Sequence, residues 1–185
     1  LLEASGCHVH LTSEAVEILF GKGKELTKRR DLSQPGEFLC EERLKLIGKS
    51  GFIDHVAVLG PVRNHVQVEL SRTDCRRLGV NAPVSLSGDL SKAEDITIAG
   101  PAGELKAAGS AIVARNHIHM RPQDGEEYGV KDRDKVDVLV QGERTLIFKD
   151  VPVRISSHFM PAMHIDFDEA NAAFVSGFTL GKILK

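Results

Sequence analysis

Residues 44–59 have the sequence LKLIGKSGFIDHVAVL, in which two apolar runs flank the four-residue turn Gly48-Lys49-Ser50-Gly51. Short aliphatic runs joined by a glycine-containing turn are typical of a β-hairpin. The same arrangement recurs around Gly100-Pro101-Ala102-Gly103 and around Gln141-Gly142-Glu143-Arg144. Many short strands with closely spaced turns favour small β-barrels over a parallel sheet or a helical bundle.

A second repeat indicates that the chain consists of two similar halves. Asp74 precedes Gly79-Val80 by five residues, and Asp124 precedes Gly129-Val130 by the same distance. Each stretch predicts a short helix closed by glycine and followed by a strand. We therefore predict a mainly β fold with short helices, built as two similar small β-barrels packed together. The expected boundary lies near residue 88, giving units 1–88 and 89–185, and exchange of strands between them is left open.

Composition excludes several classes of protein. The 185 residues are 42% apolar and 27% charged, as in ordinary globular domains, and no apolar run approaches the roughly 20 residues that span a bilayer. The net charge of −2 argues against nucleic-acid binding. Three cysteines without Cys-x-x-Cys spacing argue against a disulfide framework and favour a reducing compartment, so we expect a cytoplasmic location without membrane attachment.

The main chemical signal is a pair of His-x-His motifs, His8-Val9-His10 and His117-Ile118-His119. A strand sends residues i and i+2 to one face, roughly 7 Å apart at their Cα atoms. Two such pairs could bind one or two metal ions, although a single His on a strand is more often a half-buried, hydrogen-bonded residue. Imidazole suits zinc, copper, iron and nickel, so the pattern does not name the metal.

Three further residues are candidates for the same site. His164 lies between apolar neighbours and could serve as a fifth imidazole ligand. Glu69 is on the polar face of the alternating strand Val66–Leu70 and is either a metal ligand or an ordinary surface glutamate. Arg63 follows Gly60-Pro61 and could clamp an oxyanion through its fork of donors, or be a plain loop residue. His-Glu-x-x-His and phosphate-loop motifs are absent from the sequence.

A larger set of motifs, in this order, resembles the phosphate propanoyltransferase family, the phosphotransacylases associated with bacterial microcompartments. The matching stretches are His8-Val9-His10-Leu11, Leu26-Thr27, Asp31-Leu32-Ser33-Gln34-Pro35-Gly36, Leu59-Gly60-Pro61, Gln67-Val68-Glu69, Thr73-Asp74, Ser87-Gly88-Asp89, His117-Ile118-His119-Met120 and Met163-His164-Ile165-Asp166. Together they cover nearly the whole chain, and their combination is far more specific than any single piece.

The resemblance implies two β-barrels, two zinc ions per chain and transfer of an acyl group between coenzyme A and phosphate. One zinc would be held by His8 and His10. The second zinc would be held by Glu69 and three imidazoles, those of His117, His119 and His164. The resemblance also assigns phosphate to Arg63 as the catalytic residue, and coenzyme A to four positions: Ser5, Arg30, Leu59 and Asn171.

The chain departs from the family pattern where we expect basic residues. Cys7 and Asn116 precede the two His pairs, although Arg115 is adjacent to the second, and Ala57 lies two residues before Leu59. These changes concern the pairing of phosphate and nucleotide and leave the metal ligands intact. Microcompartment relatives often carry an N-terminal amphipathic extension, which this sequence does not show, so encapsulation and shell association stay open.

Two other functions fit the same residues. A zinc-dependent thioester hydrolase would activate water instead of phosphate, and a non-catalytic metal-binding assembly protein would enclose its metal in a complete shell of protein ligands. Phosphate dependence separates the first from an acyltransferase. The sequence does not specify the acyl chain, which could be propanoyl or acetyl, the physiological direction, or whether the chain forms a homo-oligomer.

Overall fold

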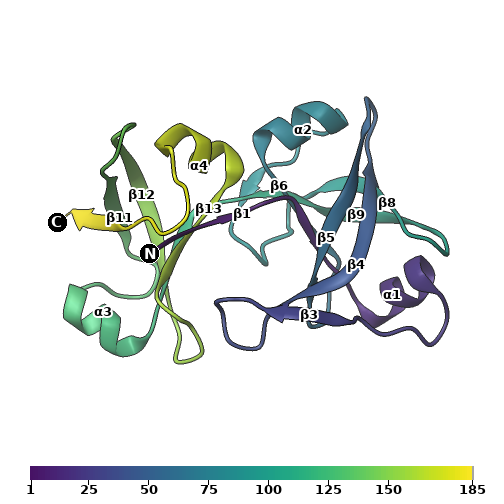
Figure 1. Cartoon of the computed structure of the whole chain (residues 1–185), viewed down its shortest axis with the longest axis horizontal. Coiled ribbons are helices and arrows are strands. Elements are labelled where there is room, and N and C mark those ends of the chain that lie inside the picture. The colour runs from purple at the N-terminus through teal and green to yellow at the C-terminus, as the bar shows by residue number, and fades with distance from the viewer. Residues whose placement is uncertain (185) are drawn as a thin grey trace. The chain divides into compact units, whose positions relative to one another are not determined.

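A computed structural model describes residues 1–184 and divides the chain into two compact units. Unit 1 consists of Leu1–Gly6 and the residues from Arg115 onward, and unit 2 is Cys7–Ala114. Both are built mainly of strands with short helices, as predicted (Figure 1). Among the described residues, every helix is too short or too polar to traverse a bilayer.

Unit 2 contains eight strands, six of which form a closed ring. Its strands are β2 (His8–His10), β3 (Lys28–Asp31), β4 (Phe38–Ile47), β5 (Phe52–Gly60), β6 (Gln67–Leu70), β7 (Val84–Ser85), β8 (Glu94–Ala99) and β9 (Glu104–Ala114). The sheet runs β4-β5-β2-β6-β9, and β8 closes it because it pairs with both β9 and β4. An aliphatic core fills the ring, with Val9, Val58, Val68 and Ile98 fully buried.

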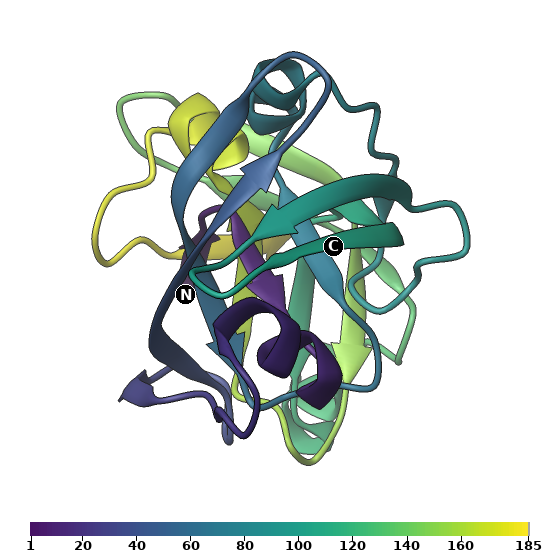
Figure 2. The same cartoon turned by 90° about the vertical axis from the view of Figure 1, so that its right-hand side faces the viewer.

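Two helices cover this barrel, α1 (Ser13–Phe20) and α2 (Arg72–Leu78), and each ends against the turn of a predicted hairpin. The Ser50 N–H donates to the carbonyl of Leu78, and the Ala102 N–H donates to that of Leu19. Figure 2 shows α1 lying beside the β8–β9 turn. A Cβ atom on Gly48 would lie 2.1 Å from the Leu78 oxygen, so the close approach itself requires glycine.

Unit 1 is a curled sheet of six strands in the order β1-β13-β10-β12-β11-β14. The elements are β1 (Leu2–Ser5), β10 (His117–Met120), β11 (Lys135–Val140), β12 (Leu146–Ile155), β13 (Ala162–Asp166) and β14 (Gly181–Leu184), with α3 (Pro122–Tyr128) and α4 (Phe167–Ala173). A single bridge between Leu2 and Thr179 links the two ends of the sheet. Its core is again aliphatic, with Val151 and Val153 fully buried.

The predicted boundary near residue 88 falls inside unit 2. The β8–β9 hairpin follows that residue in the chain but belongs to the first barrel, because its pairing with β4 and β6 closes the ring. Conversely, β1 pairs in parallel with β13, so the first residues of the chain belong to unit 1. The change from unit 1 to unit 2 falls between Gly6 and Cys7, directly before the first His pair.

One local arrangement occurs four times: a short strand, then a capping residue, then a short helix. The N-cap residues are Thr12, Ser71, Arg121 and Asp166. The predicted repeat of a short helix closed by glycine is present, because α2 and α3 each carry an Asp at the third helical position and end at a glycine with positive φ. Each strand is thereby held at its carboxyl end by a fixed helix start.

Candidate functional site

The candidate site residues share a position in this repeated arrangement. Four of them lie two residues before a helix N-cap. These residues are, in chain order, His10, Glu69, His119 and His164. In unit 2, β2 and β6 run antiparallel with His8 opposite Glu69 and His10 opposite Gln67. In unit 1, β10 and β13 repeat this register, with His117 opposite His164 and His119 opposite Ala162. Each unit therefore presents three predicted ligands on one face of a strand pair.

The unit 2 set has the geometry of a metal site. One ligand atom from each of His8, His10 and Glu69 lies within 4.8 Å of the others. His8 Nε2 is 3.5 Å from Glu69 Oε2, and the two imidazole rings are 5.1 Å apart at their centroids. His10 Nδ1 is buried without a hydrogen-bond partner among the described residues. A buried, unpartnered imidazole nitrogen close to a second imidazole and a carboxylate fits a divalent cation.

The electrostatic environment keeps His10 neutral. Burial, the neighbouring His8 and the charge of Arg63, in that order, lower the pKa of His10 well below its usual range. A neutral imidazole offers a nitrogen lone pair and is the form that ligates metals. The surroundings of His10 thus favour the neutral imidazole that a metal site requires.

The unit 1 set consists of three imidazoles. The ring centroids of His117 and His119 are 4.7 Å apart, and those of His119 and His164 are 4.8 Å apart. Both ring nitrogens of His119 are buried without a hydrogen-bond partner within residues 1–184. Burial and then the charges of neighbouring groups lower the pKa of His119 to about 2, so this ring is also neutral. These three rings form an imidazole cluster, but among the described residues only the unit 2 set brings its ligand atoms within 4.8 Å of one another.

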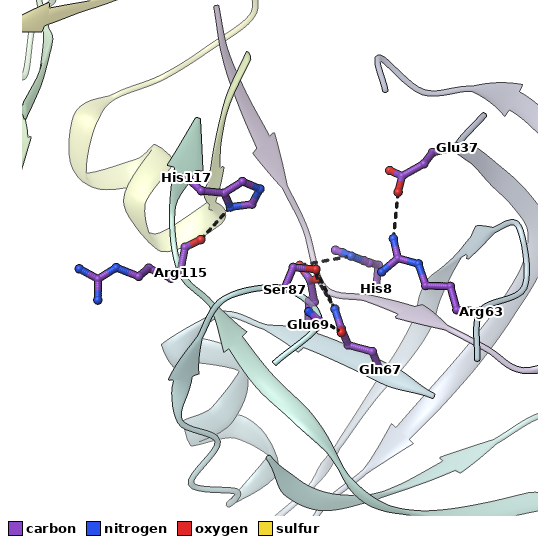
Figure 3. A network of polar contacts seen from close by, with 9 residues as sticks. His8, Glu37, Arg63, Gln67, Glu69, Ser87, Arg115 and His117 are labelled. Carbon is purple, nitrogen blue, oxygen red and sulfur yellow. Dashed lines mark hydrogen bonds and ion pairs between the residues drawn. The ribbon is translucent and has the colours of Figure 1, made fainter. Parts of the chain in front are cut away.

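Neighbouring residues orient these rings. His117 Nδ1 is 2.9 Å from the backbone carbonyl of Arg115, an acceptor, so Nδ1 carries the proton and the lone pair is on Nε2 (Figure 3). Phe159 stacks on His119 with the ring centroids 3.9 Å apart. Phe159 could not be found from the sequence, because a lone aromatic residue in a loop carries no local signal.

Glu69 also has hydrogen-bond partners that its sequence pattern does not indicate. Its Oε1 accepts a hydrogen bond from Gln67 Nε2 at 2.6 Å and another from Ser87 Oγ at 2.7 Å. The strand face that we predicted as polar is largely closed to solvent, since Gln67 is 3% exposed and the Glu69 side chain is 13% exposed. The second interpretation of Glu69, an ordinary surface glutamate, does not agree with its enclosure in this hydrogen-bond network.

Arg63 lies in unit 2 after β5, and its side chain forms an ion pair. Arg63 Nη2 is 2.9 Å from Glu37 Oε1, and the Arg63 N–H donates to the backbone carbonyl of Leu11. Both side chains of the pair remain about one-third exposed. The guanidinium is thus anchored at one nitrogen and carries further donors that could bind an anion.

The positions expected near coenzyme A are divided between the units. Ser5 ends β1 and Asn171 lies in α4, both exposed on unit 1. Arg30 lies in β3 and is exposed, whereas Leu59 lies in β5 and is half-buried, both in unit 2. Of the departures from the family pattern, Asn116 donates to Glu169 of α4 at 2.5 Å.

Comparison with known proteins adds independent evidence. The family model described as phosphate propanoyltransferase matches residues 1–176. The chain belongs to the phosphate propanoyltransferase family. A phosphate propanoyltransferase of Clostridioides difficile is 49% identical over 184 residues, covering 100% of this chain and 88% of the relative. A phosphate propanoyltransferase of Thermotoga maritima is 49% identical over 177 residues, covering 95% of this chain and 84% of the relative.

A third relative, the phosphate propanoyltransferase of Listeria monocytogenes, is 47% identical over 184 residues, covering 100% of this chain and 86% of its own. The resemblance inferred from the motifs is therefore confirmed over almost the whole chain. The protein is an enzyme of the phosphotransacylase type, a phosphate acyltransferase.

Proposed function

We propose that the protein is a zinc-dependent phosphate acyltransferase that interconverts an acyl-coenzyme A and phosphate with an acyl phosphate and coenzyme A. Propanoyl- and acetyl-coenzyme A are the proposed donors. The observation that carries the metal dependence is the set His8, His10 and Glu69, with its ligand atoms within 4.8 Å and a buried, unpartnered nitrogen. The relatives' name supplies the class of reaction and the propanoyl group.

Zinc would be held at two places in each chain. The unit 2 set would hold one ion, and the imidazoles of His117, His119 and His164 would hold the other. The family resemblance places Glu69 on the second ion, whereas its contact with His8 supports a place beside the first. When bound, zinc supplies Lewis acidity that stabilises negative charge on a thioester or a leaving thiolate.

Arg63 is the proposed phosphate-binding residue. Phosphate is already nucleophilic at neutral pH, so the protein needs mainly to bind it and orient it toward the thioester carbon. Attack forms the new carbon–oxygen bond, and the carbon–sulfur bond breaks to release coenzyme A as a thiolate. Arg63 carries a permanent charge and, through the charge-sensitive pKa of His10, is electrostatically coupled to the unit 2 set. Ser5, Arg30, Leu59 and Asn171 remain the proposed contacts of coenzyme A.

A thiol-release assay combined with metal analysis tests this function. Purified protein should contain about two zinc ions per chain and should release thiol from propanoyl- or acetyl-coenzyme A only when phosphate is present. Thiol release independent of phosphate would instead identify a hydrolase, and a metal-bound protein without thiol release would identify an assembly protein. Size-exclusion chromatography would determine whether it is a homo-oligomer, and localisation in cells would test microcompartment association.

A further inference from the structure

The carboxylate of Glu69 is constrained at one of its two oxygens. Gln67 Nε2 and Ser87 Oγ both donate to Oε1, at 2.6 and 2.7 Å, whereas Oε2 lies 3.5 Å from His8 Nε2 (Figure 3). Two short hydrogen bonds to the same oxygen fix both the position and the rotation of the carboxylate. The second oxygen is consequently directed to the side of the site where the imidazoles lie.

The donors are themselves held. The Gln67 amide nitrogen also donates to Ser87 Oγ at 3.0 Å, and the Gly88 N–H donates to Gln67 Oε1 at 3.0 Å. The oxygen of the Gln67 amide is thus engaged by the backbone, and its nitrogen by two acceptors, so the amide cannot turn over without losing all three bonds. The loop before β8 in this way closes a network around a nearly buried side chain, since Gln67 is 3% exposed.

The repeated strand arrangement shows that this network is specific to unit 2. Gln67 occupies the same place on β6 that Ala162 occupies on β13, opposite the second His of the paired strand. The alanine shows that strand pairing at this place needs no polar side chain. A buried amide is costly unless it is hydrogen-bonded, so Gln67 requires an explanation beyond the fold.

We propose that Gln67 and Ser87 form a clamp that makes Glu69 a one-oxygen metal ligand, an inference that rests on the metal centre proposed above. Oε1 already accepts from its two donors, so Oε2 is the oxygen that would be offered to an ion held by His8 and His10. Outer hydrogen bonds of this kind orient ligating carboxylates, and their removal typically costs roughly 10- to 100-fold in metal affinity. Gln67 and Ser87 are therefore positioning residues that act through Glu69.

The zinc affinity of the whole 185-residue chain, measured by competition with a chromophoric chelator, tests the clamp. Ser87→Ala should weaken one of the two zinc equivalents by roughly 10-fold, and Gln67→Ala by up to roughly 100-fold. Ser87→Thr, which keeps the hydroxyl, should restore most of the affinity. Ser91→Ala is the matched control, because the Ser91 hydroxyl donates to Asp89 on the same loop and is not part of the network.

Cobalt substitution provides a readout that general loss of stability would not change. If the clamp sets one-oxygen coordination, the visible absorption of the cobalt form should shift in Ser87→Ala and remain unchanged in Ser91→Ala. Wild-type zinc affinity and an unshifted cobalt spectrum in both Ser87→Ala and Gln67→Ala would overturn the clamp alone. A wild-type chain that binds no metal would overturn the proposed function together with the clamp.

Discussion

Replacement of Arg63 by alanine separates phosphate binding from the rest of the site. The substitution removes the guanidinium but keeps the backbone N–H that donates to the carbonyl of Leu11, so the loop after β5 should hold its conformation. In the described part of the chain the guanidinium pairs with Glu37, which is not a proposed metal ligand. We therefore expect a folded, metal-containing protein that uses phosphate poorly.

The expected loss of phosphate binding follows from how far the Arg63 side chain is exposed to solvent. Truncation of one partner of a desolvated charge pair costs about 2–5 kcal/mol. The Arg63 and Glu37 side chains are 33% and 36% exposed, so solvent screens the guanidinium and places the loss near the lower limit. A loss of about 2 kcal/mol corresponds to roughly a 30-fold lower kcat/KM for phosphate. Arg63→Lys should recover little, because an ammonium ion cannot reproduce the planar fork.

The assay varies phosphate at saturating acyl-coenzyme A and, in reverse, varies acyl phosphate. Zinc content and coenzyme A binding, measured separately, should stay close to the wild type. Arg77→Ala on the exposed side of α2 is a matched control for loss of an arginine. Wild-type phosphate kinetics in Arg63→Ala would refute the assignment, and Arg72 or Arg115 would become the better candidate.

Three further outcomes are expected. His117→Ala together with His119→Ala should lower bound zinc to about one ion per chain and greatly reduce activity, as elemental analysis and thiol release will determine; unchanged metal content would contradict the unit 1 site. Gly48→Ala should lower the free energy of unfolding by about 1–3 kcal/mol in denaturant titration, because its Cβ would overlap the Leu78 carbonyl, whereas Gly142→Ala, which meets no atom within 4 Å, should be nearly neutral. Ser71→Ala removes the α2 N-cap and should cost about 1 kcal/mol, or roughly 2–4 °C in Tm; an unchanged Tm would show that the cap is dispensable.

Local pattern predicted the hairpins and the helix starts because each depends on neighbouring residues. The turn at residues 48–51 was visible from its glycines, and the structure adds that the adjacent helix end excludes a side chain there. The division of the chain was not visible in the same way. No local pattern in residues 1–11 marks a boundary at Gly6, and only the pairing of β1 with β13, in which Leu2 lies opposite Met163, assigns the first residues to unit 1.

The candidate ligands were predictable from period-two alternation, whereas their partners were not. Alternation places residues i and i+2 on one face, so a sequence can nominate His8 with His10 or mark Glu69 as unusual. It does not reveal that a loop about 20 residues later returns to bond one oxygen of that carboxylate, as Ser87 does. The same alternation cannot distinguish a solvent-facing glutamate from an enclosed one, because both read as a polar residue between apolar neighbours. The network around Gln67 makes that distinction, and it is also the feature that turns a pattern of ligands into a site of defined geometry.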